Sequence, residues 1–189
     1  MKRFSGMKRF PGMVRFPVLL LAALPLLTAN AIPSSPELGK AEGQCRPGEI
    51  GPAFVVEVVG LKDRIGRLKL EVYPGVDPDW LADDNVLIMA GKTFRRVEVP
   101  VPVEADPHLC IRIPGPGTYG LALLHERDGN HRFNWQHDGI GFSANPRLGF
   151  SQPRAARVAV QAGGGITTLR IVMNYRTGLL SFGPLVKNQ

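Results

Sequence analysis

The sequence predicts an all-β protein, a single antiparallel β-sandwich of the immunoglobulin-like or transthyretin-like type with about seven strands. Short segments in which apolar and polar residues alternate recur along the chain, and turn-forming residues separate them. The 189 residues include 22 glycines and 17 prolines but only 7% aromatic residues, which is typical of a turn-rich β protein. A closed barrel produces the same alternation and remains the alternative architecture.

One domain accounts for this length. Residues 32–52 are rich in Pro, Gly, Ser and Glu without periodicity, and they predict an extended N-terminal arm. The expected organisation is a signal peptide over 1–31, the arm over 32–52, the β-sandwich over 53–176 and a C-terminal tail over 177–189.

The clearest strand signal runs from Arg67 to Tyr73. Leu68, Leu70 and Val72 are expected to point inward, and charged residues alternate with them. The other expected strands are Phe54–Val59, Val97–Val103, Leu109–Ile113, Thr118–Leu124, Val158–Val160 and Leu169–Tyr175.

Two segments need separate treatment. Pro100 and Pro102 interrupt the strand Val97–Val103 on one face, and because proline cannot donate a ladder hydrogen bond, this strand is expected at a sheet edge. The segment Asp77–Ala90 is expected to hold one helical turn, capped by Asp77 or Asp79.

The first 31 residues have the three parts of a secretory signal. Five basic residues and no acidic residue precede an apolar stretch from Val18 to Leu27, and the small-x-small pattern Ala29-Asn30-Ala31 follows. Ten apolar residues are too few to span a bilayer, which takes about 20, so cleavage is favoured over a membrane anchor. The mature chain is expected to begin at Ile32, and translation could start at Met1, Met7 or Met13.

Export decides how the two cysteines are interpreted. An even number of cysteines in an oxidising compartment favours a disulfide between Cys45 and Cys110. Metal ligation is the alternative, but the pair lacks the close spacing of zinc sites.

Three stretches of the chain resemble a known family. They are Gly117-Thr-Tyr-Gly-Leu-Ala-Leu-Leu-His125 with Asp128-Gly-Asn130, then Gly139-Ile-Gly-Phe-Ser143, and then Leu169-Arg-Ile-Val-Met-Asn-Tyr175. Together they resemble the secreted bacterial family catalogued as domain of unknown function 2141, over residues 53–176. The resemblance implies a β-sandwich domain located outside the cytoplasm, with no assigned activity.

The chain departs from that family pattern at four places. Glu126 stands where the family has Asp, and Asp128 where it has Asn. Asn134 replaces an acidic residue, and the segment before Gly-Phe-Ser is shortened to Asp138-Gly-Ile-Gly141. The last two changes remove carboxylates, which argues against carrying a metal site over from the family.

The loop after the strand Thr118–Leu124 holds the densest group of polar residues. Its oxygen-bearing side chains are spaced as in a partial Ca²⁺-binding loop, and the candidate ligands are Glu126, Asp128, Asn130, Asn134 and Asp138. The alternative is a turn whose Asx side chains bond to their own backbone, with no cofactor required. His125 is expected to anchor the loop, and Gly129 to allow its tight bend.

No catalytic residue is predicted. The combination of Ser143, His125 and Asp138 suggests a hydrolase as the alternative function, but no nucleophile elbow surrounds Ser143. The preferred hypothesis is an exported, non-enzymatic module that binds an envelope protein or a glycan through the 125–145 loop, where Trp135 offers a stacking surface.

Nucleic acid is not an expected partner. The total net charge is +7, but the signal segment carries five of these charges, which leaves +2 for residues 32–189. This balance is too small to predict nucleic-acid binding.

Overall fold

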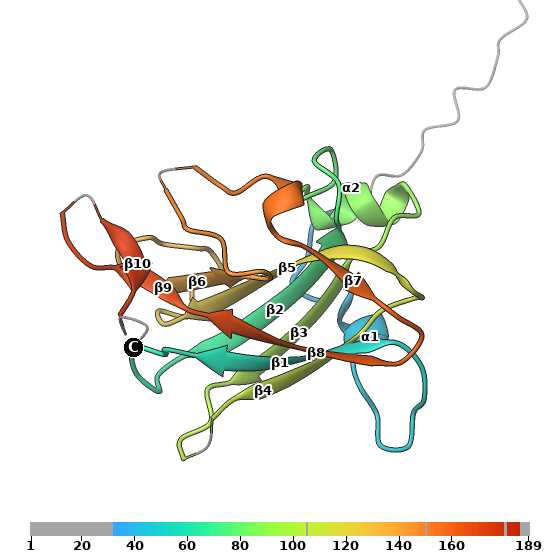
Figure 1. The fold of residues 1–189 in the computed structure, drawn as a ribbon, viewed down its shortest axis with the longest axis horizontal. Helices are drawn as coiled ribbons and strands as arrows, with labels where there is room; N and C mark the ends of the chain where they lie inside the picture. The colour runs from blue at the N-terminus through green and yellow to red at the C-terminus, as the bar shows by residue number, and fades with distance from the viewer. Residues whose placement is uncertain (1–31, 105, 150, 180, 186–189) are drawn as a thin grey trace, which may run out of the picture. The chain divides into compact units, whose positions relative to one another are not determined.

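The fold consists of two β-sheets packed face to face in a computed structural model (Figure 1). The structure describes residues 32–104, 106–149, 151–179 and 181–185. The predicted signal peptide and its cleavage point lie outside the described residues. Within the described ranges, no helix is long and apolar enough to cross a membrane.

The larger sheet has the strand order β10-β9-β6-β5-β2-β3, and β7 also pairs with β5. All of its pairings are antiparallel. Its strands are β2 (Arg67–Pro74), β3 (Arg95–Pro100), β5 (Gly117–Glu126), β6 (Gly139–Phe142), β7 (Ala159–Ala162), β9 (Asn174–Arg176) and β10 (Phe182–Pro184).

The smaller sheet has the order β4-β1-β8, formed by β1 (Ala53–Val59), β4 (His108–Arg112) and β8 (Ile166–Val172). β1 is antiparallel to β4 and parallel to β8. The predicted all-β sandwich is therefore confirmed, with ten strands and one parallel pairing in the described chain.

The predicted last strand, Leu169–Tyr175, is divided between the two sheets. β8 ends at Val172, and β9 begins at Asn174 in the other sheet. Between them Met173 is fully buried, and its backbone N–H donates to the Val59 carbonyl at 2.8 Å. β10 then pairs with β9, so the segment predicted as a tail contributes a strand.

The main core lies between the sheets and confirms the predicted alternation in β2. Leu68, Leu70 and Val72 are fully buried in it, together with Leu121 and Leu123 of β5. A second apolar cluster covers the other face of the larger sheet near α2 (Asp84–Met89) and the 3-10 turn η1 (Ala155–Arg157). Both faces of β2 are consequently covered along part of its length.

β3 lies at the edge of the larger sheet, as Pro100 and Pro102 predicted. β3 ends at Pro100, which is exposed, and the next residue, Val101, turns into the core. The N–H of Val101 donates to the Gly66 carbonyl at 3.2 Å, so the chain after Pro100 stays hydrogen-bonded to the residue that precedes β2.

The N-terminal arm is more ordered than expected. It contains α1 (Lys40–Gly43), and the Arg96 N–H of β3 donates to the Gly39 carbonyl at 3.1 Å. The predicted disulfide between Cys45 and Cys110 is present, with Cα atoms 5.9 Å apart, and it ties the arm to β4.

The helical segment within Asp77–Ala90 is α2, but its predicted caps are wrong. The residue at its N-cap is Asp83, which makes no capping hydrogen bond with its side chain. Asp77 accepts a hydrogen bond from the Ala155 N–H at 2.8 Å, and Asp79 pairs with Lys92 at 2.5 Å. Asp77 thus binds the 3-10 turn η1, and Asp79 binds Lys92 after α2, so neither carboxylate caps the helix.

Candidate functional site

His125 lies at the end of β5 with its side chain fully buried. Its Nε2 lies 2.8 Å from the Ile65 carbonyl, which can only accept, so Nε2 carries the proton. Its Nδ1 accepts from the Tyr175 hydroxyl at 2.6 Å, and that oxygen accepts from the Lys62 N–H at 3.2 Å. The neutral ring therefore joins the β1–β2 loop, β5 and β9 at the point where the 125–145 loop begins.

The environment of His125 keeps it neutral. Burial lowers the pKa of His125, although the hydrogen bond to the Ile65 carbonyl and the charge of Asp63 oppose this shift. Burial also raises the pKa of Tyr175 to about 12, so its hydroxyl keeps the proton that it donates. Arg127, whose Nε lies 2.9 Å from Asp63, balances the nearest carboxylate.

Acid should therefore destabilise the fold through His125. The unfolded histidine binds a proton near pH 6.5, above the lowered pKa of the folded one, so stability falls as the pH drops below about 6.5. We expect the melting temperature to decrease between pH 7 and 5.5, and His125→Gln to flatten this slope in thermal denaturation. The exposed His137→Gln is the control and should keep the wild-type slope; an unchanged slope in His125→Gln would contradict the assignment.

Three of the predicted metal ligands hold the loop's own backbone. Asp128, Asn130 and Asn134 each accept, through a side-chain oxygen, the backbone N–H two residues further along, at 3.2, 2.7 and 3.0 Å. These are Asx turns, the alternative that the sequence left open. Gly129 lies in the first of them with a φ of +72°, in the left-handed region that favours glycine.

Asp138 closes the base of the same loop. Its buried carboxylate accepts the N–H groups of Arg127 at 2.9 Å and Asn134 at 2.8 Å. The two oxygens thus bind one backbone amide at the start of the loop and one near its middle.

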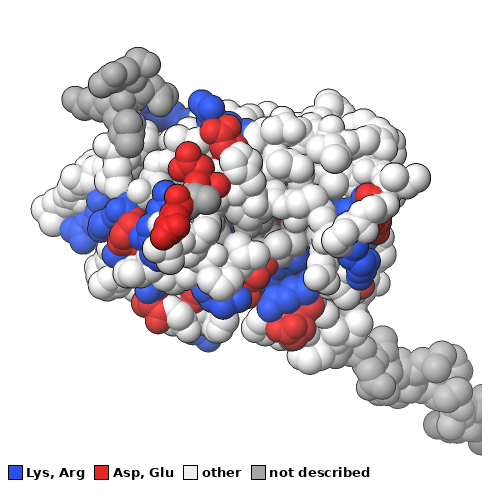
Figure 2. Space-filling model, turned by 90° about the horizontal axis from the view of Figure 1, so that it is seen from below, with Lys and Arg blue, Asp and Glu red and all other residues white. Residues whose placement is uncertain are grey.

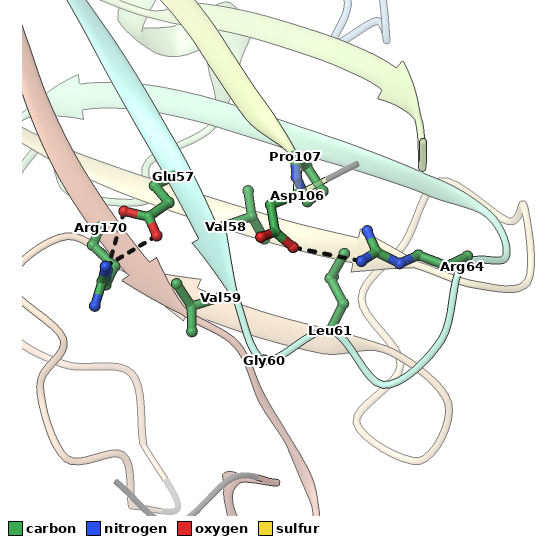
Figure 3. A pocket seen from close by; sticks show the side chains of 9 residues that line it. All are labelled: Glu57, Val58, Val59, Gly60, Leu61, Arg64, Asp106, Pro107 and Arg170. Carbon is green, nitrogen blue, oxygen red and sulfur yellow. Dashed lines mark hydrogen bonds and ion pairs between the residues drawn. The ribbon is translucent and has the colours of Figure 1, made fainter. Parts of the chain in front are cut away.

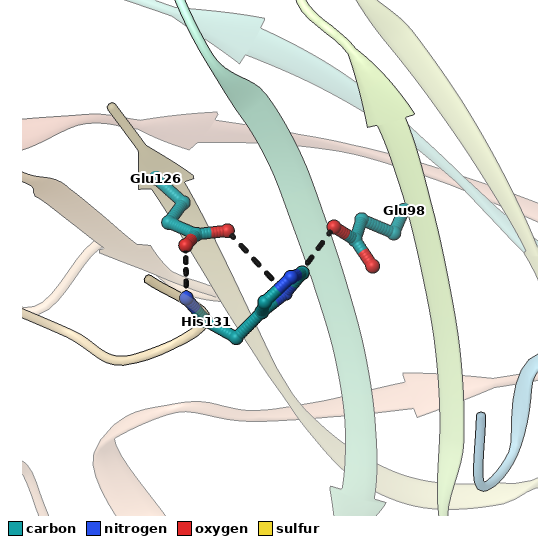
Figure 4. A group of neighbouring side chains, drawn as sticks. All are labelled: Glu98, Glu126 and His131. Carbon is teal, nitrogen blue, oxygen red and sulfur yellow. Dashed lines mark hydrogen bonds and ion pairs between the residues drawn. The ribbon is translucent and has the colours of Figure 1, made fainter. Parts of the chain in front are cut away.

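A different group has the donor set of a metal site. The ligand atoms of Glu98, Glu126 and His131 all lie within 4.8 Å of one another (Figure 4). Among the described residues, no other group of three His, Cys, Asp or Glu side chains is this close together. Of the three predicted carboxylates, Glu126 belongs to it, and Asp128 and Asp138 do not. Sequence reasoning missed Glu98, although the alternation of Val97 and Val99 places it on the outward face of β3.

Among the described residues, the side chains considered for a hydrolase form hydrogen bonds to other partners and not to one another. Ser143 is fully buried, donates to the Val158 carbonyl and accepts the Leu121 N–H at 2.9 Å. His125 and Asp138 use their polar atoms as described above. In the described residues the three form no hydrogen-bonded relay.

An apolar groove lies beside the 125–145 loop and has a volume of about 750 Å³. Phe133 and Trp135 are 46% and 47% exposed, and Phe133 packs edge-to-face on Phe182 with ring centres 6.3 Å apart. The Arg176 guanidinium lies 4.6 Å from the centre of the Trp135 ring. Leu81, Ile140, Phe142, Leu148, Leu179 and Pro153 are also among the lining residues.

The two tryptophans have different roles. Trp80 is 4% exposed and donates from Nε1 to the Pro153 carbonyl at 2.9 Å, which makes it part of the second core. Trp135 is the one that faces solvent in the groove.

A smaller cavity of about 310 Å³ lies at the end of β1 (Figure 3). Its charged lining residues face one another: Glu57 pairs with Arg170 at 3.0 Å, and Arg64 lies 3.7 Å from Asp106. These contacts leave its charges mutually compensated.

On the face of the molecule drawn in Figure 2, basic and acidic side chains lie next to one another. Arg96, in the basic pair Arg95-Arg96, is only 8% exposed and binds Glu71 and Asp84 at 2.7 and 3.2 Å. It holds the arm, through the Ser35 carbonyl, and α2, through Asp84, onto β3.

A family model described as "Uncharacterized protein conserved in bacteria (DUF2141)" matches residues 56–170. The chain belongs to this family. The match covers most of the sandwich, including β5, β6 and the loop between them, which we call the Asx-turn loop after the turns at Asp128, Asn130 and Asn134. It confirms the resemblance. No curated protein and no solved structure matches this DUF2141 protein significantly.

Part of the groove in this DUF2141 protein lies beyond the family match. Leu179 and Phe182 come from the β9–β10 hairpin, which follows residue 170. Sequence reasoning missed these two residues because no periodicity in 177–189 indicates a strand.

Proposed function

We propose that this protein is a non-enzymatic binding module that acts outside the cytoplasm and binds an amphiphilic anion in the apolar groove beside the 125–145 loop. The Cys45–Cys110 disulfide is compatible with such a location. The single observation that carries the proposal is the groove itself, in which Phe133 and Trp135 remain about half exposed. Exposed aromatic side chains gathered in a hollow are typical of a binding site.

The size and lining of the groove favour an apolar ligand body. Its volume of about 750 Å³ lies within the range of roughly 300–1,000 Å³ that is usual for small-molecule sites. A glycan, the other ligand class considered, requires several polar side chains beside the aromatic platform. Here the polar lining side chains are Ser151, Gln152 and Ser181, and the other lining side chains are aliphatic or aromatic, so the groove offers more contact to an acyl chain than to a sugar.

The charge around the groove favours an anionic ligand. Arg147 and Arg154 are exposed and adjoin the lining residues Leu148 and Pro153, and Arg176 stacks on Trp135. An acidic head group is therefore complementary to the rim, whereas a cationic one is repelled.

Titration with matched amphiphiles tests this proposal. Dodecanoate should change the tryptophan fluorescence, since Trp135 is exposed and Trp80 is buried, and calorimetry should give a Kd. Dodecyltrimethylammonium, which has the same chain and the opposite charge, should bind at least about tenfold more weakly. Trp135→Ala should weaken dodecanoate binding by about tenfold, because the apolar platform is lost.

The control variant is Val103→Ala, which removes a 78% exposed apolar side chain after β3, at the opposite edge of the larger sheet from β10. It should bind dodecanoate as the wild type does. Equal binding of both amphiphiles would overturn the charge argument. Saturable binding of maltohexaose to Trp135 without dodecanoate binding would favour a glycan module, and turnover of ester substrates would favour the alternative hydrolase.

A further inference from the structure

Glu98, Glu126 and His131 meet on the outward face of the larger sheet. The register pairs Lys69 of β2 with Glu98 of β3, and Arg67 of β2 with Glu126 of β5. Arg67 and Lys69 are two residues apart and share one face, so both glutamates project from that same face. His131 reaches them from the Asx-turn loop (Figure 4).

Glu126 is a buried carboxylate with an unpartnered oxygen. Its side chain is fully buried, and Oε1 accepts the His131 backbone N–H. Oε2 is buried without a hydrogen-bond partner among the described residues. A buried, unsatisfied carboxylate oxygen costs free energy unless a positive group faces it.

The His131 ring faces this oxygen at a distance that is too long for a hydrogen bond. Nδ1 lies 3.9 Å from Glu126 Oε2 and 3.9 Å from Glu98 Oε1. Ligand atoms around a tetrahedral ion with bonds of 2.0–2.2 Å lie about 3.4 Å apart. A contraction of about half an ångström would therefore bring Nδ1 to the separation of metal ligands from each carboxylate oxygen, and the two oxygens already lie within 4.8 Å of one another.

Two basic side chains hold Glu98 in place. Arg67 Nε lies 2.6 Å from Oε1, and Lys40 Nζ lies 3.3 Å from Oε2. Burial alone would raise the pKa of Glu98, but the hydrogen bonds from Arg67 and Lys40 keep it below its usual value. These two contacts fix the Glu98 carboxylate with Oε1 3.9 Å from His131 Nδ1.

We infer that Glu98, Glu126 and His131 form a binding site for a divalent transition-metal ion of the Zn²⁺ or Mn²⁺ class. Such an ion supplies the positive charge that Glu126 Oε2 lacks. It ties β3 and β5 to the Asx-turn loop, whose own Asp128 and Asp138 are occupied by backbone amides.

The donor set selects the class of ion. An imidazole nitrogen with two carboxylates suits Zn²⁺ and Mn²⁺, whereas Ca²⁺ takes six to eight oxygen ligands. The His131 side chain is 53% exposed, so the ion can enter from solvent, and three protein ligands leave a coordination position for water. This selection distinguishes the site from the partial Ca²⁺-binding loop that the sequence suggested.

Calorimetry and thermal denaturation of the EDTA-stripped protein test the site with Zn²⁺, Mn²⁺ and Ca²⁺. Zn²⁺ or Mn²⁺ should bind with a stoichiometry of one and raise the melting temperature by several degrees, and Ca²⁺ should do neither. Glu126→Gln and His131→Ala should each weaken binding at least about tenfold.

The matched controls lie in the same loop. Asp128→Asn and His137→Ala remove an exposed carboxylate and an exposed imidazole, and both variants should bind the ion as the wild type does. Equal loss in the controls, or no saturable binding of Zn²⁺ or Mn²⁺ to the wild type, would overturn the proposal. In the second case, a changed melting temperature in metal-free His131→Ala would assign the ring a direct electrostatic contact with Glu126. Binding of Ca²⁺ that is lost in Asp128→Asn would favour the Asx-turn loop as the site instead.

Discussion

Replacing both Cys45 and Cys110 with alanine is expected to lower the free energy of unfolding by about 4 kcal/mol. The disulfide spans 65 residues, and opening it releases the conformational entropy of a long loop in the unfolded chain. It also frees the arm, whose Ser35 carbonyl accepts from Arg96 and whose Gln44 pairs with Ile111. Chemical denaturation of the two proteins measures the difference.

Reduction of the wild type provides the control for this substitution. Reduced wild type and the double variant should unfold at the same denaturant concentration, because both lack only the cross-link. Oxidised and reduced wild type unfolding together would contradict the predicted contribution of the disulfide.

Gly66→Ala is expected to destabilise the fold by about 3 kcal/mol or more, through backbone strain and a steric clash. Gly66 has a φ of +77°, and an added Cβ would lie 2.0 Å from the Glu126 carbonyl oxygen and 2.8 Å from the Arg127 Cα. The β1–β2 loop would have to move away from the start of the 125–145 loop. Equilibrium unfolding in urea measures the loss.

Gly164→Ala is the matched control, since an added Cβ there has no neighbour within 4 Å and the backbone does not require glycine. Its stability should change by less than about 1 kcal/mol. Similar losses in both variants would show that the close contact at Gly66 is not the cause.

Local patterns predicted the sheets because alternation fixes which face of a strand is buried. In β2, Leu68, Leu70 and Val72 lie in the core as expected. The outward residue Glu71 is nevertheless only 9% exposed, because Arg96, which is distant in sequence and also binds Asp84 of α2, pairs with it. Local alternation contains no information about such a second layer.

The candidate sites were harder to predict from the sequence, because they also depend on contacts between residues distant in the chain. Asp128, Asn130 and Asn134 satisfied both the metal and the Asx-turn patterns, and only the direction of their oxygens distinguishes the two. Glu98 and Glu126 become neighbours through the pairing of β2 with both β3 and β5. The groove requires β9 and β10 to fold back beside the loop, which no periodic pattern indicates.

The most direct test of groove binding is to find where a ligand attaches. A dodecanoate analogue with a diazirine at the end of its chain can be photo-crosslinked to the protein and located by peptide mass spectrometry. We predict labelling of groove residues such as Phe133, Trp135 and Leu148, suppressed by excess dodecanoate. Labelling at Val59 or Leu61 in the smaller cavity, or labelling that dodecanoate does not suppress, would contradict binding in the groove.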